Sequence, residues 1–176
     1  VYKRQGSGKS SLINLIPRFY DATEGQVLVD GVDVREYTLA SLHQKLGYVP
    51  QRAVMFSGTI TSNVGYGADH ATEAQVKQAV QIAQAADFVD SVGYAGPVAQ
   101  GGANLSGGQK QLLNLASVMA MQPEVLILDE PTSQLDPIAA SDFLNTVRKI
   151  NLELGTTVIM TEHRLEDIFP VADRAV

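Results

Sequence analysis

The sequence predicts an α/β fold in which helices cover both faces of a parallel β-sheet. Short apolar runs alternate along the chain with stretches of helical periodicity, which is the pattern of a doubly wound sheet. The run 125–128 (VLIL) is apolar at every position, as expected of a strand buried on both faces. The glycine-rich run 6–11 (GSGKSS) directly precedes an apolar helix, which predicts a phosphate-binding loop. With 176 residues, the chain can form one domain with a sizeable core.

Local sequence features predict the helices, strands and turns of the first half of the chain. Residues 11–16 present an apolar helical face that Pro17 ends. The pair Asp30-Gly31 is flanked by alternating runs, which predicts a β-hairpin over 25–34. The segment after Ile60 is rich in Gly and Asn and reads as a loop. The other elements expected here are a short helix over 39–45 and a strand over 46–49.

In the second half, helix caps define the elements. Thr72 with Gln75 forms a capping box, Ser106 can N-cap a helix, and Asp136 precedes a proline at the first helical position. Gly155 can end that last helix in a left-handed conformation. The predicted elements are a helix over 72–86, a glycine-rich connection over 93–103, a helix over 106–120, a strand over 125–128, a helix over 137–154 and a strand over 156–160.

Composition excludes some classes of function. The formal net charge is −6 and there is no dense run of Lys or Arg, so no nucleic-acid partner is expected. No apolar run approaches the roughly 20 residues that span a bilayer, so any work at a membrane needs a partner segment. The absence of cysteine fits a reducing compartment.

The glycine-rich run provides the first candidate site. Backbone N–H groups there would surround phosphates, the lysine would add a point charge and the serine after it a hydroxyl ligand for Mg²⁺. The phosphate-binding residues are Gly6, Ser7, Gly8, Lys9, Ser10 and Ser11. The full motif, G-x-x-x-x-G-K-[ST], needs a glycine where Lys3 stands. We therefore interpret residues 1–5 as a foreign leader and 6–176 as the domain, with a divergent phosphate loop as the alternative.

Further polar residues follow the predicted strands. Gln51 comes after the strand at 46–49, Asp129 and Glu130 follow 125–128, and His163 follows 156–160. The ligand site of such a sheet lies at the carboxyl ends of its strands, so these side chains are candidates for one site. Each signal taken singly has a plain structural alternative, such as solvated acids or a surface histidine. Their order and spacing together carry the interpretation.

These motifs, with the LSGGQ segment at 105–109, resemble the nucleotide-binding domain of ABC transporters over residues 6–176. The resemblance implies a P-loop NTPase with an ABC-type core, truncated at both ends, with a helical subdomain at about 52–120. It implies ATP and Mg²⁺ as cofactors, and ATP hydrolysis as the reaction. By resemblance, Glu130 is the general base, His163 the switch histidine and Gln51 the glutamine that couples to a permease. The implied metal ligands are Ser10, Gln51 and Asp129.

The LSGGQ segment implies a second phosphate contact. The helix that Ser106 caps would offer its N-terminus to phosphate, although residues 6–11 already serve this chain's own nucleotide. In the resembled family, a head-to-tail dimer places this segment on the partner's γ-phosphate, and Asp136 lies at the interface. The residues so assigned are Ser106, Gly107, Gly108, Gln109 and Asp136. The implied partners are a second ATPase domain and a transmembrane permease, which places the domain at the cytoplasmic face of the cell membrane.

Two parts of the chain resemble different subfamilies of ABC transporters. Residues 11–109 are similar to exporters, through 17–21 (PRFYD), 56–60 (FSGTI) and 101–104 (GGAN), whereas residues 110–176 are similar to the ATPase subunits of energy-coupling-factor importers. Either the protein is a natural intermediate or two genes were joined near LSGGQ, and we favour the join. Export is slightly favoured over import. The other hypotheses are a non-transport ABC ATPase acting on nucleic acid or ribosomes, and an inactive truncated or chimeric fragment.

Overall fold

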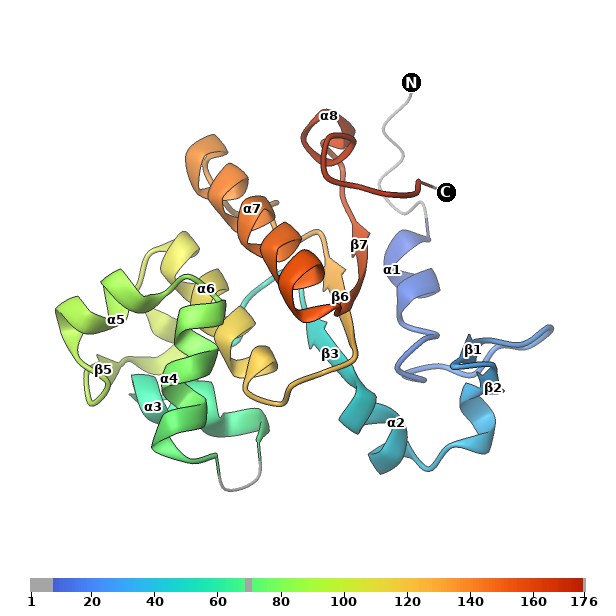
Figure 1. Ribbon diagram of the computed structural model, residues 1–176, viewed down its shortest axis with the longest axis horizontal. Helices are drawn as coiled ribbons and strands as arrows, with labels where there is room; N and C mark the ends of the chain where they lie inside the picture. The colour runs from blue at the N-terminus through green and yellow to red at the C-terminus, as the bar shows by residue number, and fades with distance from the viewer. Residues whose placement is uncertain (1–7, 69–70, 176) are drawn as a thin grey trace.

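The computed structural model describes residues 8–68 and 71–175 (Figure 1). The predicted leader, residues 1–5, lies outside this part of the chain, and so do Gly6 and Ser7 of the predicted phosphate loop. Within the described residues, no helix is both long and apolar enough to cross a membrane.

A parallel sheet forms the centre of the fold. Its described strands are β3 (Leu46–Val49), β6 (Val125–Asp129) and β7 (Thr157–Thr161), in the order β3-β6-β7. Leu46 pairs with Val125, and Asp129 pairs with Thr161 at the other end. The carboxyl ends of β6 and β7 therefore meet at one edge of the sheet. The predicted parallel α/β arrangement is confirmed.

Strand β6 is buried on both faces. Leu126 and Leu128 pack into one core with helices α6 (Gly107–Met119) and α7 (Pro137–Leu154). Ile127, between them, packs into a second core with α1 (Lys9–Ile13) and α2 (Leu39–Lys45). Alternate side chains of a strand point to opposite faces, so an unbroken apolar run is what this position requires. Figure 1 shows α7 and α1 on opposite sides of β6 and β7.

A mainly helical layer lies beside the sheet (Figure 1). It contains α3 (Ile60–Val64), α4 (Glu73–Ile82), α5 (Ala86–Val92) and the start of α6. The strands β4 (Gly58–Thr59) and β5 (Pro97–Val98) pair antiparallel at its edge. The remaining elements are β1 (Leu28–Val29), β2 (Val32–Asp33), α8 (Leu165–Ile168) and the 3₁₀ turns η1 (Val34–Glu36), η2 (Gly65–Gly67) and η3 (Gln100–Gly102).

The predicted loop after Ile60 is wrong, because α3 occupies this segment. Its first turn is closed by a capping box in which Thr59 accepts from the Ser62 N–H, and Ser62 accepts from the Thr59 N–H. Ile60 and Val64 are completely or almost completely buried against the helical layer. A helix of five residues has little stability by itself, so tertiary packing decides its formation.

The predicted helix over 72–86 ends earlier than expected. Its start is confirmed, since Thr72 and Gln75 form the predicted capping box. It ends at Ile82, and Gln84 adopts a left-handed conformation with φ 55°. A separate helix, α5, then begins at Ala86 and ends at Val92, in a stretch for which no element was predicted beyond residue 86. The predicted connection over 93–103 contains β5 and η3.

The helix predicted over 11–16 and ended by Pro17 stops earlier, because α1 ends at Ile13 and residues 14–18 are turns.

Other local predictions are confirmed. Strands β1 and β2 form the hairpin, with Asp30 and Gly31 at positive φ as a type I′ turn requires. Asp136 caps α7 by accepting from the N–H groups of Ile138 and Ala139. The helix ends at Leu154, and Gly155 follows with φ 69°.

Removing side-chain volume from β6 should destabilise the protein. Leu126 is 0% exposed, so Leu126→Ala should lower the free energy of unfolding by about 2–5 kcal/mol through lost burial and the cavity that remains. Leu152→Ala is the matched control, because Leu152 is 70% exposed and its truncation should change little. Urea denaturation followed by circular dichroism measures both. Equal losses for the two variants would contradict the central place of β6.

Candidate functional site

The candidate site lies where β6 and β7 end and α1 begins. Asp129 is the last residue of β6, and Thr161 is the last residue of β7. Gly8 precedes α1 with φ 76°, a left-handed conformation that suits glycine, and Lys9 opens the helix. The topology thereby places Lys9 beside residues about 120–150 positions later in the sequence, as the contacts of Lys9 and Ser10 below show.

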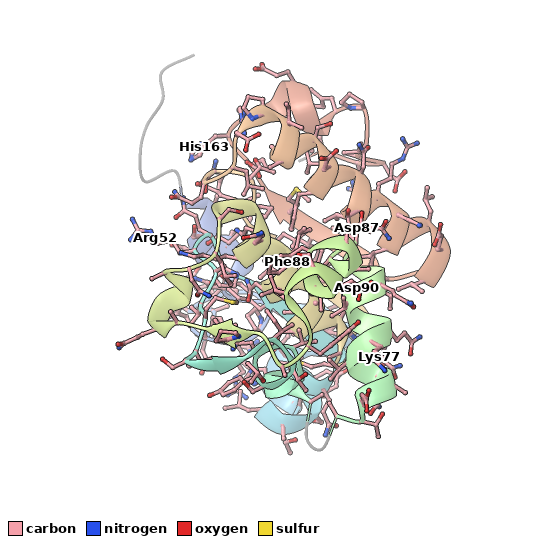
Figure 2. The ribbon with its side chains drawn as sticks, turned by 90° about the vertical axis from the view of Figure 1, so that its left-hand side faces the viewer. Arg52, Lys77, Asp87, Phe88, Asp90 and His163 are labelled. Atoms are coloured by element: carbon pink, nitrogen blue, oxygen red, sulfur yellow. The ribbon has the colours of Figure 1, made fainter. Side chains whose placement is uncertain are left out.

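Lys9 is held by groups from both strand ends. Its Nζ donates to the backbone oxygen of Glu162 at 3.2 Å and lies 3.0 Å from His163 Nδ1. It also lies 3.5 Å from Glu130 Oε1. Figure 2 shows His163 on the same side of the view as Arg52, the neighbour of Gln51, whereas Lys77 of α4 lies on the opposite side. The predicted residues Lys9, Glu130 and His163 are therefore brought together.

The contacts of His163 define its tautomer. Because the Lys9 ammonium can only donate, His163 Nδ1 accepts from it. The other ring nitrogen, Nε2, lies 2.7 Å from Glu130 Oε1 and carries the proton that it donates to this carboxylate. A neutral imidazole satisfies both contacts, with one nitrogen accepting and the other donating.

Glu130 is the point at which the site converges. Its Oε2 accepts a hydrogen bond from Gln51 Nε2 at 2.9 Å, while Oε1 faces Lys9 and His163. The residue is buried and has φ 46°, a left-handed conformation that is uncommon outside glycine. Its N–H donates to the Thr161 carbonyl at 3.0 Å. Backbone strain of this kind is concentrated at functional sites.

Asp129 faces a different set of groups. Its Oδ1 accepts from Ser10 Oγ at 3.1 Å and from Thr161 Oγ1 at 2.8 Å. The Tyr48 hydroxyl lies 3.5 Å from Oδ2 and donates to Asn14 at 3.0 Å. Burial, together with the Asp129 charge and hydrogen bond, raises the pKa of Tyr48 to about 12, so this phenol remains a donor. Sequence reasoning identified neither Tyr48 nor Thr161 as part of the site.

The donor set fits Mg²⁺ bound together with phosphate. Ser10 and Asp129 present a hydroxyl and a carboxylate side by side, and hard oxygens of this kind are the ligands that Mg²⁺ takes. In the described part of the chain, no group of three or more His, Asp or Glu side chains could hold a metal ion alone. Mg²⁺ in phosphate-transfer sites takes one or two carboxylates and completes its shell with phosphate and water. The amide of Gln51 contacts Glu130, so its predicted metal role stays a prediction.

Gln111 is a buried residue that sequence reasoning missed. From α6, its Nε2 donates to the Pro131 carbonyl at 3.0 Å and lies 3.4 Å from the Gln51 carbonyl. The Gln111 side chain therefore connects the backbone at Gln51 with the backbone that follows Glu130. The sequence offers only a weak signal for it, because Gln111 follows the polar pair Gln109 and Lys110 and precedes the apolar Leu112.

The LSGGQ residues lie at the start of α6. Ser106 Oγ accepts from the Gln109 N–H at 3.2 Å, and Gln109 Oε1 accepts from the Ser106 N–H at 2.9 Å, so the predicted N-cap is confirmed. A Cβ on Gly107 would lie 3.2 Å from the Gln134 carbonyl. This segment thus packs against the turn that leads to Asp136. Among the described residues, no recorded hydrogen bond or ion pair joins 106–109 to Lys9, Ser10 or Asp129.

Comparison with known proteins identifies relatives along most of the chain. The family model described as "ABC transporter" matches residues 4–133. The heterocyst differentiation ATP-binding protein HepA of Nostoc is 40% identical over 173 residues, which cover 97% of this chain and 28% of that protein. The ATP-dependent lipid A-core flippase of Syntrophus aciditrophicus is 39% identical, with the same two coverages. ABC transporter B family member 19 of Arabidopsis thaliana is 44% identical over 165 residues, 93% of this chain and 13% of that protein.

A solved structure gives the same result. A bacterial Atm1-family ABC exporter with ATP bound superposes with a TM-score of 0.83 at 40% identity, covering 94% of this chain and 29% of that chain. This chain spans less than a third of the length of these relatives. The alignments extend past Gln109, so similarity to an exporter continues into residues that the sequence likened to importer subunits.

The capping role of Ser106 predicts a stability effect. Ser106→Ala removes the side-chain acceptor for the Gln109 N–H and should destabilise the protein by about 1 kcal/mol. Ser117→Ala on the same helix is the control, and it should change the stability by less than about 0.5 kcal/mol. Urea denaturation of both variants measures the difference. If Ser106→Ala is as stable as Ser117→Ala, the cap contributes nothing to the folded state.

Proposed function

The chain belongs to the ABC transporter family, and on that premise we propose that it binds and hydrolyses ATP to power solute transport across a membrane. Its fold is that of a P-loop NTPase of the ABC type. The observation that carries the proposal is the convergence of Lys9, Gln51 and His163 on the buried carboxylate of Glu130. One of these three donors, Lys9, can also pair with phosphate, so an oriented carboxylate lies beside the proposed phosphate site, which suits hydrolysis better than binding alone.

In the proposed reaction, ATP phosphates are bound by residues 6–11, and Lys9 neutralises part of their charge. Bound Mg²⁺, held by Ser10 and Asp129, would withdraw electron density from the phosphate oxygens. Ser10 and Thr161 both donate to Asp129 Oδ1, which fixes the orientation of that carboxylate. The predicted role of Gln51 toward the metal forms part of this proposal.

Glu130 is the proposed general base. A water attacks the γ-phosphorus as Glu130 takes its proton, and the bond from phosphorus to the bridging oxygen breaks to release ADP and phosphate. His163 Nε2–H and Gln51 Nε2–H donate to the two oxygens of Glu130 and so orient them. The left-handed backbone of Glu130 turns its side chain back toward Lys9 at the strand end.

The proposed assembly has two further components. Ser106, Gly107, Gly108 and Gln109 lie with the turn before Asp136, apart from the contacts of Lys9, and this arrangement supports a role toward the nucleotide of a second ATPase domain. A transmembrane permease would carry the solute and hold the domain at the cytoplasmic face of the membrane. Export is the proposed direction, because the relatives include proteins named as a lipid A-core flippase and putative multidrug export proteins.

Replacing the proposed base tests the reaction. Glu130→Gln keeps the shape of the side chain but removes its basicity, and it should slow ATP hydrolysis by roughly 10²–10⁴-fold while ATP binding is retained. Phosphate release measures turnover, and a fluorescent ATP analogue measures binding. Glu153→Gln makes the same change on the exposed surface of α7 and should leave both values unaltered. Unchanged turnover in Glu130→Gln would overturn the assignment.

The proposed dimer has its own test. With hydrolysis slowed, Glu130→Gln in ATP and Mg²⁺ should accumulate as a dimer, so light scattering should report twice the monomer mass. Adding Lys9→Ala should return the protein to a monomer, because the phosphate charge then has no lysine partner. A Glu130→Gln protein that binds ATP but stays monomeric at all concentrations would contradict the head-to-tail arrangement.

A further inference from the structure

Glu162, immediately before His163, has contacts that the proposed reaction does not use. The residue is 8% exposed. Its Oε1 accepts two hydrogen bonds from Thr132, one from Oγ1 at 2.7 Å and one from the backbone N–H at 2.9 Å. Its Oε2 accepts from the N–H of His163 at 3.2 Å. One carboxylate thus binds the start of the β6–α7 connection and the backbone of the histidine.

The backbone of Glu162 adds a third connection. Its carbonyl oxygen accepts from Lys9 Nζ at 3.2 Å, within the group that faces Glu130. Glu162 is therefore in contact with the lysine of the phosphate site, with His163, and with Thr132. These belong to three segments that are far apart in the sequence.

Thr132 is a fixed point in the connection between β6 and α7. It is 2% exposed and lies two residues after Glu130. Its carbonyl accepts from the Leu135 N–H at 3.0 Å, which closes the turn leading to Asp136, and Arg164 Nη2 lies 3.4 Å from the same oxygen. A displacement of Thr132 would therefore move the segment that ends at Asp136.

Burying the Glu162 carboxylate costs free energy of desolvation, so a contribution to stability alone does not explain why a carboxylate is found here. Removing a charge from water is unfavourable, and well-packed apolar residues often stabilise a protein as much or more. A carboxylate is also an acceptor with no donor, and Glu162 faces three donors at 2.7, 2.9 and 3.2 Å. The arrangement fixes geometry, because each oxygen has its own partner segment.

We propose that Glu162 is a positioning residue that holds His163 and the Thr132–Asp136 turn as one unit. This inference rests on the proposed function. His163 would meet the γ-phosphate of this chain's own ATP, while Asp136 would face the second ATPase domain. A rigid link through Glu162 ties the orientation of His163, and through it Glu130, to the position of the turn. The link couples the two nucleotide sites of the proposed dimer.

Glu162→Gln tests the link with little change in shape. An amide has one acceptor oxygen and one donor nitrogen, so it can keep the acceptor for Thr132 or for His163 but cannot serve both. We expect kcat for ATP hydrolysis to fall roughly 10- to 100-fold, the scale of a misplaced catalytic group, and KM for ATP to change less than about twofold. Glu153→Gln is the control. Thermal unfolding is measured on both variants.

Thr132 provides a second, independent variant. Thr132→Val keeps the side-chain volume but removes the hydroxyl that donates to Glu162 at 2.7 Å. Because both substitutions disturb the same set of hydrogen bonds around Glu162, the double variant should lose less kcat than the product of the two single losses. Thr146→Val is the matched control, since Thr146 is also a buried threonine but donates to the Asp142 carbonyl within α7.

The outcomes separate this inference from the proposed function. If the unmodified protein does not hydrolyse ATP, the proposed function fails and this inference fails with it. If it does hydrolyse ATP, and Glu162→Gln lowers the unfolding temperature with an unaltered kcat, then Glu162 serves only folding and the inference is overturned. Multiplicative losses in the double variant would also overturn it. A lower kcat with unaltered KM and a non-multiplicative double variant would support it.

Discussion

The burial of β6 on both faces is the constraint on which the rest of the structure depends. Leu126 and Leu128 fill the core beneath α6 and α7, and Ile127 fills the core beneath α1 and α2. Packing on both faces fixes the position of the strand, and therefore also the position of the residues at its carboxyl end. Asp129 and Glu130 therefore reach the sheet edge at which α1 begins and β7 ends.

At that edge, two adjacent carboxylates have separate surroundings. Asp129 is surrounded by hydroxyl groups, from Ser10, Thr161 and Tyr48, which suits a metal ligand. Glu130 is surrounded by nitrogen donors from Lys9, Gln51 and His163. Glu130 lies just past the end of β6 and has a left-handed backbone, so its side chain does not continue the pattern of the strand. The proposed division between metal binding and proton transfer has this geometric basis.

The LSGGQ segment and the turn that ends at Asp136 lie together, apart from the side-chain contacts of Lys9 and Glu130. The LSGGQ segment packs against the turn that ends at Asp136, and Thr132 at the other end of that turn is bound by Glu162. The proposed partner-facing surface is thus attached to the strand ends of this chain's own site. Similarity to a putative multidrug export protein over 93% of the chain, and to a solved ABC exporter over 94%, agrees with an arrangement in which both parts work as one domain.

The sequence by itself determined the features that depend on neighbours in the chain. The caps at Thr72, Ser106 and Asp136, the hairpin at Asp30-Gly31 and the buried strand were all predictable, because their hydrogen bonds or apolar pattern lie within a few residues. Only tertiary structure decided α3 and α5, since helices of five and seven residues depend on packing. It also decided the contacts of Glu162 with Thr132 and of Tyr48 with Asp129, because no local pattern specifies which distant polar groups meet when the strands align.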